Sequence, residues 1–238
     1  MSNISGAAIF AAALALGGGI AGGGFFVGQT MVNREHVNTA DVKGLSERVV
    51  SSDQAIWQIG FKVSNADVKA GYGDVETNTA AIRAFLARNG FDGDAVMGGQ
   101  TSVTENEFRD ANGVLTETRY DIVSYVAVTT KDVKAVDAAY QKLGELIAQG
   151  LLLTDSQPRY LFTGLNTVKP DMLREATENA RIAAGEFAKN AGIKVGSIRS
   201  ASQGGFEVHD LNSGDYGTDD RSIDKQVRVV TTVTFYLD

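Results

Sequence analysis

Two stretches of this chain, residues 53–130 and 157–237, show the same order of periodic segments: strand, helix, strand, strand. Alternation of apolar and polar residues is typical of a half-buried strand, and apolar residues spaced by three and four are typical of an amphipathic helix. Short turns between neighbouring strands favour antiparallel pairing. The order therefore predicts an α+β fold with mainly antiparallel sheets, built of two β-α-β-β-like halves.

The first half begins with alternating apolar residues from Ala55 to Val63. Its other expected segments are a helix over 68–86, a strand over 99–108, a turn at 110–113 and a strand over 116–130. Asn89-Gly90 supplies a stop signal for the helix. A further helix is expected over 133–150, between the two halves.

The second half is expected to contain a strand over 159–165, a helix that starts at Pro170, and strands over 195–202 and 226–237. The residues predicted to face inward on this helix are Leu173, Ala176, Ala180, Ala184, Phe187 and Ala188. The last strand is rich in β-branched residues, and a flat apolar strand must be paired on both sides or covered. It is therefore either central in its sheet or pairs copies of the chain.

The N-terminal residues 4–32 form a stretch without a charged residue. This stretch is longer than the roughly 20 residues that a membrane-spanning helix needs. A positive segment and a well-placed Ala-x-Ala site, both typical of a cleaved signal peptide, are missing. Residues 1–33 are thus expected to be an uncleaved transmembrane anchor; a removed signal peptide and a buried soluble helix are the alternatives. Residues 34–39 form a connector, and residues 40–238 the folded domain.

Glycines recur in the apolar segment at the small-xxx-small spacing that lets membrane helices approach closely. The residues with this spacing are Gly18, Gly19, Gly22, Gly23, Gly24 and Gly28. They are candidates for helix packing in the membrane, although a merely glycine-rich anchor explains them equally well. Gly17, Gly19 and Gly22 also fit a dinucleotide fingerprint, but no strand precedes them, so no nucleotide cofactor is expected.

The composition argues against several classes of function. The net charge is −7, so no positive field is available to hold a nucleic acid. The protein has no cysteine and only two histidines, His36 and His209, so metal ligands of these types are scarce. Common hydrolase and nucleotide-binding motifs are absent. We expect no enzymatic activity and no cofactor.

Acidic residues gather in the glycine- and serine-rich stretch 209–224, where Asp210, Asp215, Asp219 and Asp220 are candidate partner-binding residues. Their order does not match a calcium loop. His209-Asp210 could orient a base toward Ser202 or Ser213, but such a trio is common in loops and carries little weight. A solvated hairpin loop is the simplest interpretation.

Several longer motifs resemble the SIMPL-domain family. They are Val42-Lys-Gly-Leu-Ser-Glu-Arg48, Ala55-Ile-Trp57, Tyr160-Leu-Phe-Thr-Gly-Leu-Asn166, Lys169-Pro170, Glu175-Ala-Thr-x-Asn179-Ala-Arg181, Phe187-Ala188 and Lys225-x-Val-Arg-Val-Val-Thr-Thr232. The resemblance covers residues 40–238. It implies an extracytoplasmic α+β domain, assembly into large homo-oligomers, and a link to envelope or oxidative stress in some relatives. It attaches no catalytic residues to these motifs.

The sequence and the resemblance together predict a non-enzymatic envelope protein. It would be anchored in the bacterial inner membrane by a single pass, with its domain in the periplasm, and would assemble with copies of itself in a structural or scaffolding role. The alternative is a periplasmic module that binds a small ligand or a partner protein through the acidic 209–224 loop. Nucleic acid is not expected as a partner.

Overall fold

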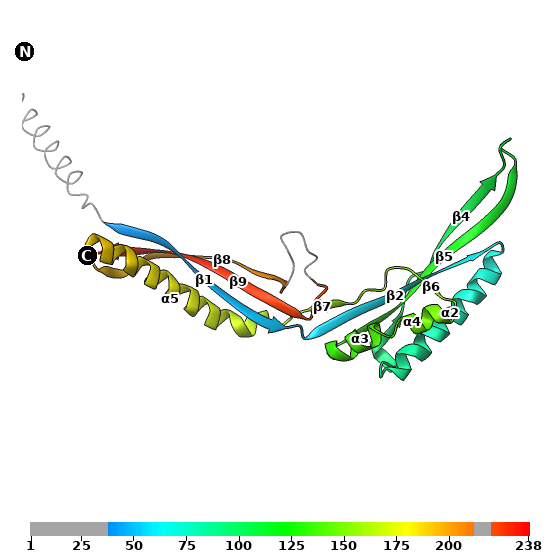
Figure 1. Cartoon of the computed structure of the whole chain (residues 1–238), viewed down its shortest axis with the longest axis horizontal. Coiled ribbons are helices and arrows are strands. Elements are labelled where there is room, and N and C mark those ends of the chain that lie inside the picture. The colour runs from blue at the N-terminus through cyan, green and yellow to red at the C-terminus, as the bar shows by residue number, and fades with distance from the viewer. Residues whose placement is uncertain (1–37, 212–219) are drawn as a thin grey trace, which may run out of the picture.

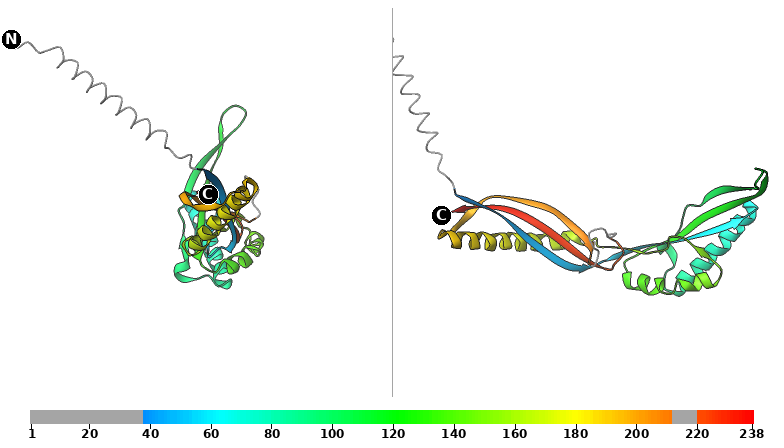
Figure 2. Two further views of the ribbon diagram at one scale, coloured as in Figure 1. Left: turned by 90° about the vertical axis from the view of Figure 1, so that its left-hand side faces the viewer. Right: turned by 45° about the horizontal axis from the view of Figure 1, so that its top comes forward.

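The computed structural model describes residues 38–211 and 220–238, which form two lobes placed end to end (Figure 1). The proximal lobe contains Asn38, the first residue that the structure describes, and Asp238. The distal lobe comprises residues 54–161. In both lobes helices lie against one face of a sheet (Figure 2).

The proximal lobe is a three-stranded antiparallel sheet covered by one long helix. Its elements are β1 (Thr39–Ser51), α5 (Leu165–Ala191), β8 (Val195–Asp210) and β9 (Asp224–Leu237). The strand order is β1-β9-β8, and β1 pairs with β9 along its whole length. The strand 226–237 is therefore central in its sheet, the first of its two predicted placements.

Alanine side chains let α5 lie very close to the sheet. Met172 and an alanine at every fourth position from Ala176 to Ala188 are buried. A Cβ atom added at Gly44 on β1 would lie 1.8 Å from the carbonyl oxygen of Ala176 and 2.6 Å from the amide nitrogen of Ala180. The two backbones touch at this point, so only glycine fits there.

The distal lobe contains one antiparallel sheet, with strands of different lengths, and the helices that cover it. Its elements are β2 (Gln54–Asn65), α2 (Val68–Arg88), a 3₁₀ turn (Gly93–Ala95), β3 (Val96–Gly98), β4 (Ser102–Arg109), β5 (Leu115–Thr130), α3 (Val133–Tyr140), α4 (Gly144–Ala148), β6 (Leu152–Leu153) and β7 (Arg159–Leu161). The strand order is β3-β5-β2-β6, with β4 also pairing with β5 and β7 with β2.

The core of the distal lobe is built around Trp57, which is fully buried. Its ring meets those of Phe85 and Tyr140 edge-on, with centroids 6.3 Å apart in each pair. The indole Nε1 donates a hydrogen bond of 2.7 Å to the carbonyl oxygen of Ser156. Because the polar end of the ring is satisfied, the whole indole can be buried.

A two-stranded arm projects from the distal lobe (Figure 1). It consists of β4, the turn 110–114 and the facing residues 115–123 of β5. The large apolar side chains exposed on it are Val103, Phe108, Val114 and Leu115. An isolated two-stranded hairpin is only marginally stable in water. A projecting hairpin that also exposes several large apolar side chains is therefore unusual in a monomer.

The prediction of an α+β fold with antiparallel sheets is confirmed, but the second half is assembled differently. The strand expected over 159–165 is only β7, and it pairs with β2 in the distal sheet. Its place beside β9 is taken by β1. The β-α-β-β unit is therefore β1-α5-β8-β9, and the distal lobe is inserted between β1 and α5. Local periodicity missed this because the partners Ser51 and Asp224 lie far apart in the sequence.

Three helix details also differ from the prediction. The segment expected as one helix over 133–150 is α3 and α4, separated at 141–143. Helix α5 starts at Leu165 rather than Pro170; a turn in which Thr167 donates to the carbonyl oxygen of Gly164 precedes the proline. Phe187, expected inside, has 64% of its surface exposed, because it lies to one side of the alanine stripe that faces the sheet.

Within the residues that the structure describes, no helix is both long and apolar enough to cross a membrane. The predicted anchor, with Gly18, Gly19, Gly22, Gly23, Gly24 and Gly28, lies outside the described residues.

Candidate functional site

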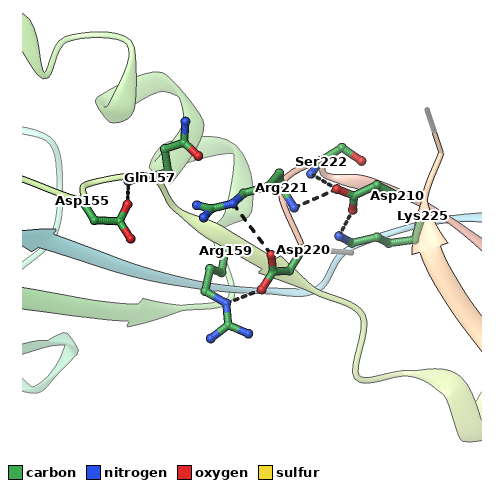
Figure 3. Close-up of polar contacts among 8 residues, drawn as sticks. All are labelled: Asp155, Gln157, Arg159, Asp210, Asp220, Arg221, Ser222 and Lys225. Carbon is green, nitrogen blue, oxygen red and sulfur yellow. Dashed lines mark hydrogen bonds and ion pairs between the residues drawn. The ribbon is translucent and has the colours of Figure 1, made fainter. Parts of the chain in front are cut away.

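The junction between the lobes contains Asp210 and Asp220, two of the four acidic residues that the sequence singled out (Figure 3). Three segments meet there: the β1–β2 connection, the β7–α5 connection and residues 220–225 before and within β9. Because β8 and β9 run antiparallel, Asp210 at the end of one strand faces Lys225 at the start of the other.

The Asp210 carboxylate and the Lys225 ammonium group form a buried ion pair. The Lys225 side chain has 1% of its surface exposed and that of Asp210 8%. Lys225 Nζ donates to Asp210 Oδ1, and the backbone amides of Arg221 and Ser222 donate to Oδ2 at 2.8 and 3.0 Å. Burial raises the pKa of Asp210, but the hydrogen bonds from Lys225 and the two amides outweigh it, so the pKa lies below its usual value.

Asp220 ties the end of the acidic loop to the distal lobe. Its carboxylate accepts a hydrogen bond from Arg159 Nε on β7 and lies 4.0 Å from Arg221 Nε. The Tyr160 amide donates to the Asp220 carbonyl oxygen at 2.7 Å. Since β7 pairs with β2, this contact links the β8–β9 connection to the distal sheet.

Backbone hydrogen bonds close the junction on its other side. The Ser52 amide donates to the carbonyl oxygen of Ile223 at 2.8 Å, and the Asp53 amide to that of Leu161 at 3.0 Å. Asp53 Oδ1 accepts from the Thr163 amide at 2.8 Å. Both backbone crossings between the lobes are thus held together, which restricts how the lobes can turn relative to each other.

The structure places the four predicted loop residues in two groups. Asp210 and Asp220 form ion pairs within the molecule, Asp210 with Lys225 and Asp220 with Arg159. Asp215 and Asp219 lie outside the described residues. Sequence reasoning missed Lys225 and Arg159. A signal for Lys225 was present, because it occupies an inward position in the alternation that continues through Val227 and Val229.

The histidine beside Asp210 does not build a catalytic trio in the described part of the protein. His209 Nε2 lies 3.8 Å from Glu207 Oε2 on the same strand. Neighbouring residues of a strand point to opposite faces, so the His209 ring and the Asp210 carboxylate leave β8 on opposite sides. Ser202 lies seven residues earlier on β8, and at about 3.3 Å per residue it is far from both. The other candidate, Ser213, lies outside the described residues.

A small cavity of about 140 Å³ lies beside the junction, lined by Asp137, Tyr140, Gln157, Pro158, Tyr160 and Arg221. The Tyr160 hydroxyl lies 3.4 Å from Asp137 Oδ1. Burial, followed by the charge of Asp137, raises the pKa of Tyr160, so the hydroxyl stays protonated at neutral pH. Over residues 38–211 and 220–238, no cluster of three His, Cys, Asp or Glu residues could hold a metal ion.

The motif residues of β1 and α5 meet each other across the proximal lobe. Glu175 accepts a hydrogen bond of 2.7 Å from Ser46 Oγ and lies 3.5 Å from Arg48 Nη2. Asn179 Nδ2 donates to the carbonyl oxygen of Leu45 at 2.8 Å. The Arg181 guanidinium lies 5.1 Å from the centre of the Phe235 ring. These motif positions hold β1 and the helix together.

The family profile of SIMPL, described as a protein of unknown function (DUF541), matches residues 40–235. The chain belongs to the SIMPL family. This confirms the resemblance deduced from the motifs, and the matched SIMPL region covers both lobes. No curated protein sequence matches this chain.

Proposed function

We propose that this SIMPL protein is a non-enzymatic structural protein of the bacterial cell envelope. In this proposal residues 1–33 anchor it in the inner membrane by a single pass, and the SIMPL domain stands in the periplasm. Copies of the protein assemble through the distal lobe into a homo-oligomer. A link to envelope or oxidative stress rests on the family resemblance alone.

The arm is the observation that carries self-assembly. It exposes Val103, Phe108, Val114 and Leu115, and two strands alone are marginally stable in water. Among the described strands, β4 pairs only with β5, so its outer edge is open. An open edge with exposed apolar side chains favours pairing with another strand. A second copy of the arm offers the same edge and the same side chains.

The test compares particle sizes of the full-length protein in a mild detergent by light scattering. The double variant Phe108→Glu, Val114→Glu is expected to give a much smaller particle than the unchanged protein. Ile147→Glu is the matched control, because Ile147 on α4 is equally exposed but lies outside the arm. An unchanged protein that is monomeric at micromolar concentration would disprove the assembly.

The second candidate is a module that binds a partner through the 209–224 loop. It is less well supported, because Asp210 and Asp220 already bind Lys225 and Arg159. Removing residues 212–219 while keeping both ion pairs is the decisive variant. A partner that is captured by the full-length protein and lost with this deletion would favour the binding module.

A further inference from the structure

An apolar groove of about 330 Å³ lies at the free end of the proximal lobe. Its lining residues are Thr39, Ala40, Asp41, Phe187, Ala191, Ile193 and Leu237. They come from the start of β1 and the ends of α5 and β9, which lie together at the end of the molecule farthest from the distal lobe (Figure 1). The groove therefore opens where the polypeptide enters the domain.

The character of this surface fits a lipid boundary. Phe187, the largest lining side chain, is 64% exposed, although its family motif partner Ala188 is buried. The single acidic residue of the lining, Asp41, accepts a hydrogen bond of 2.5 Å from Thr234. Lys189 and Lys194 flank the lining residues, as do Glu186 and Asp238, and all four are exposed. An exposed aromatic ring among apolar side chains, with charged residues of both signs around them, suits the boundary between lipid headgroups and the outer acyl region.

The connector limits how far the groove can be from the membrane. Five residues, 34–38, separate the proposed anchor from Thr39. Even fully extended, this connection spans only about 20 Å, at 3.3–3.6 Å per residue. The 13 residues of β1 extend for about 43 Å at 3.3 Å per residue. The connector therefore keeps the groove end of the proximal lobe near the membrane, whereas the other end of β1 lies farther away than the connector is long.

We infer that the groove end of the proximal lobe rests on the lipid surface, with Phe187 in the headgroup and outer acyl region. This inference depends on the proposed membrane anchor and adds a second point of contact to it. Two contacts, the anchor and the groove, fix the direction in which the lobes extend from the bilayer. A single flexible tether would leave that direction free.

The absence of cysteine allows a direct measurement on the full-length protein. The variants Phe187→Cys and Ala191→Cys place a nitroxide label at the groove, and Ile147→Cys places one at an equally exposed helical site of the distal lobe. The protein is reconstituted into phosphatidylethanolamine and phosphatidylglycerol vesicles. Each label's collision rates with oxygen, which concentrates in lipid, and with a water-soluble nickel chelate are then compared.

The ratio of oxygen to nickel collisions is expected to be several-fold higher at positions 187 and 191 than at 147. Equal ratios at all three sites, in protein that floats with the vesicles, would overturn the lipid contact and leave the anchor intact. Low access to both reagents with spin–spin broadening at 187 would instead place a second copy in the groove, which also overturns it. Protein that fails to float with the vesicles would overturn the anchor, and the lipid contact with it.

Discussion

At the scale of single residues, the junction depends on a charge that is costly to bury. Removing an ammonium group and a carboxylate from water is unfavourable, and the cost is offset only when both groups are well paired. The Asp210 carboxylate meets this condition through Lys225 and two backbone amides. The same carboxylate orders residues 221 and 222, which continue into the contacts with the distal lobe.

Replacing Asp210 with asparagine should strongly destabilise the protein. The buried Lys225 ammonium would lose the Asp210 carboxylate, and breaking a buried pair in this way costs about 3–5 kcal/mol. Urea unfolding followed by circular dichroism measures the change in the free energy of unfolding. Asp121→Asn is the control, because Asp121 pairs with Lys62 at the surface and its loss should have little effect. Equal effects of both substitutions would contradict the buried-pair account.

The same pair should make stability depend on pH in the acid range. The pKa of Asp210 is lower in the folded protein than its unfolded value of about 4. Its stabilising contribution is therefore complete above the unfolded pKa and is lost as the pH falls from there through the folded pKa. The free energy of unfolding should fall more steeply below pH 4 in the unchanged protein than in Asp210→Asn. Parallel pH profiles would disprove this role.

The site residues show what sequence patterns could and could not reveal. The sequence shows the acidic stretch 209–224 as a candidate partner loop, and the structure adds that Asp210 and Asp220 form ion pairs within the molecule. Those pairings follow from the register of β8 with β9 and from the position of β7. Register depends on contacts between distant segments, which composition and local spacing do not contain.

At the scale of elements, the contact between β1 and α5 sets the thickness of the proximal lobe. Alanines on the helix and Gly44 on the strand allow the backbones to touch. The opposite face of this sheet has no covering layer among the described residues (Figure 2), and Leu45 and Val49 are exposed there. The proximal lobe thus has only one interior interface, and its stability depends on that interface.

Gly44→Ala should destabilise the proximal lobe. The new methyl group would overlap the Ala176 carbonyl oxygen and force α5 away from β1, at a cost of at least the 1–3 kcal/mol or so typical of overpacking. Gly185→Ala is the matched control, because nothing lies within 4 Å of its added Cβ and alanine favours a helix by roughly 0.5–1 kcal/mol. Thermal unfolding should therefore shift downward in the first variant and upward in the second.

The elements themselves were largely predictable because their periodicity is local. The alternation from Ala55 to Val63 and the helical spacing over 68–86 correspond to β2 and α2. The strand β1 was not predicted, because Gly44 and Ser46 occupy inward positions and Leu45 an outward one, which makes its apolar alternation weak. Its place in the sheet comes from pairing with β9 at the other end of the sequence. Phe187 was predicted to face inward, but it precedes the buried Ala188 by one residue on α5. Its side chain therefore points beside the row of buried alanines, toward the exposed groove.

At the scale of the whole molecule, the distal lobe is an insertion whose two ends are joined. Asp53 and Leu161, which bound it, are connected by a backbone hydrogen bond of 3.0 Å. Its buried core draws on residues between Ala55 and Tyr160, and Ile223 is the one described residue that contributes from outside this range. The proximal lobe, in contrast, needs segments from both sides of the insertion. The distal lobe therefore meets the usual requirements for folding by itself.

Residues 53–163 produced alone should fold cooperatively. Trp57, the single tryptophan of the protein, lies at the centre of this core, so its fluorescence reports on the distal lobe specifically. The isolated fragment is expected to show the same emission maximum as the full-length protein and a single urea transition. It should be somewhat less stable, because the Arg159–Asp220 contact and the packing of Ile223 are lost.

In the full-length protein, Gly44→Ala should leave the Trp57 transition nearly unchanged while lowering the stability measured by circular dichroism. A fragment with water-exposed Trp57 emission would instead show that the distal lobe folds only on the proximal one.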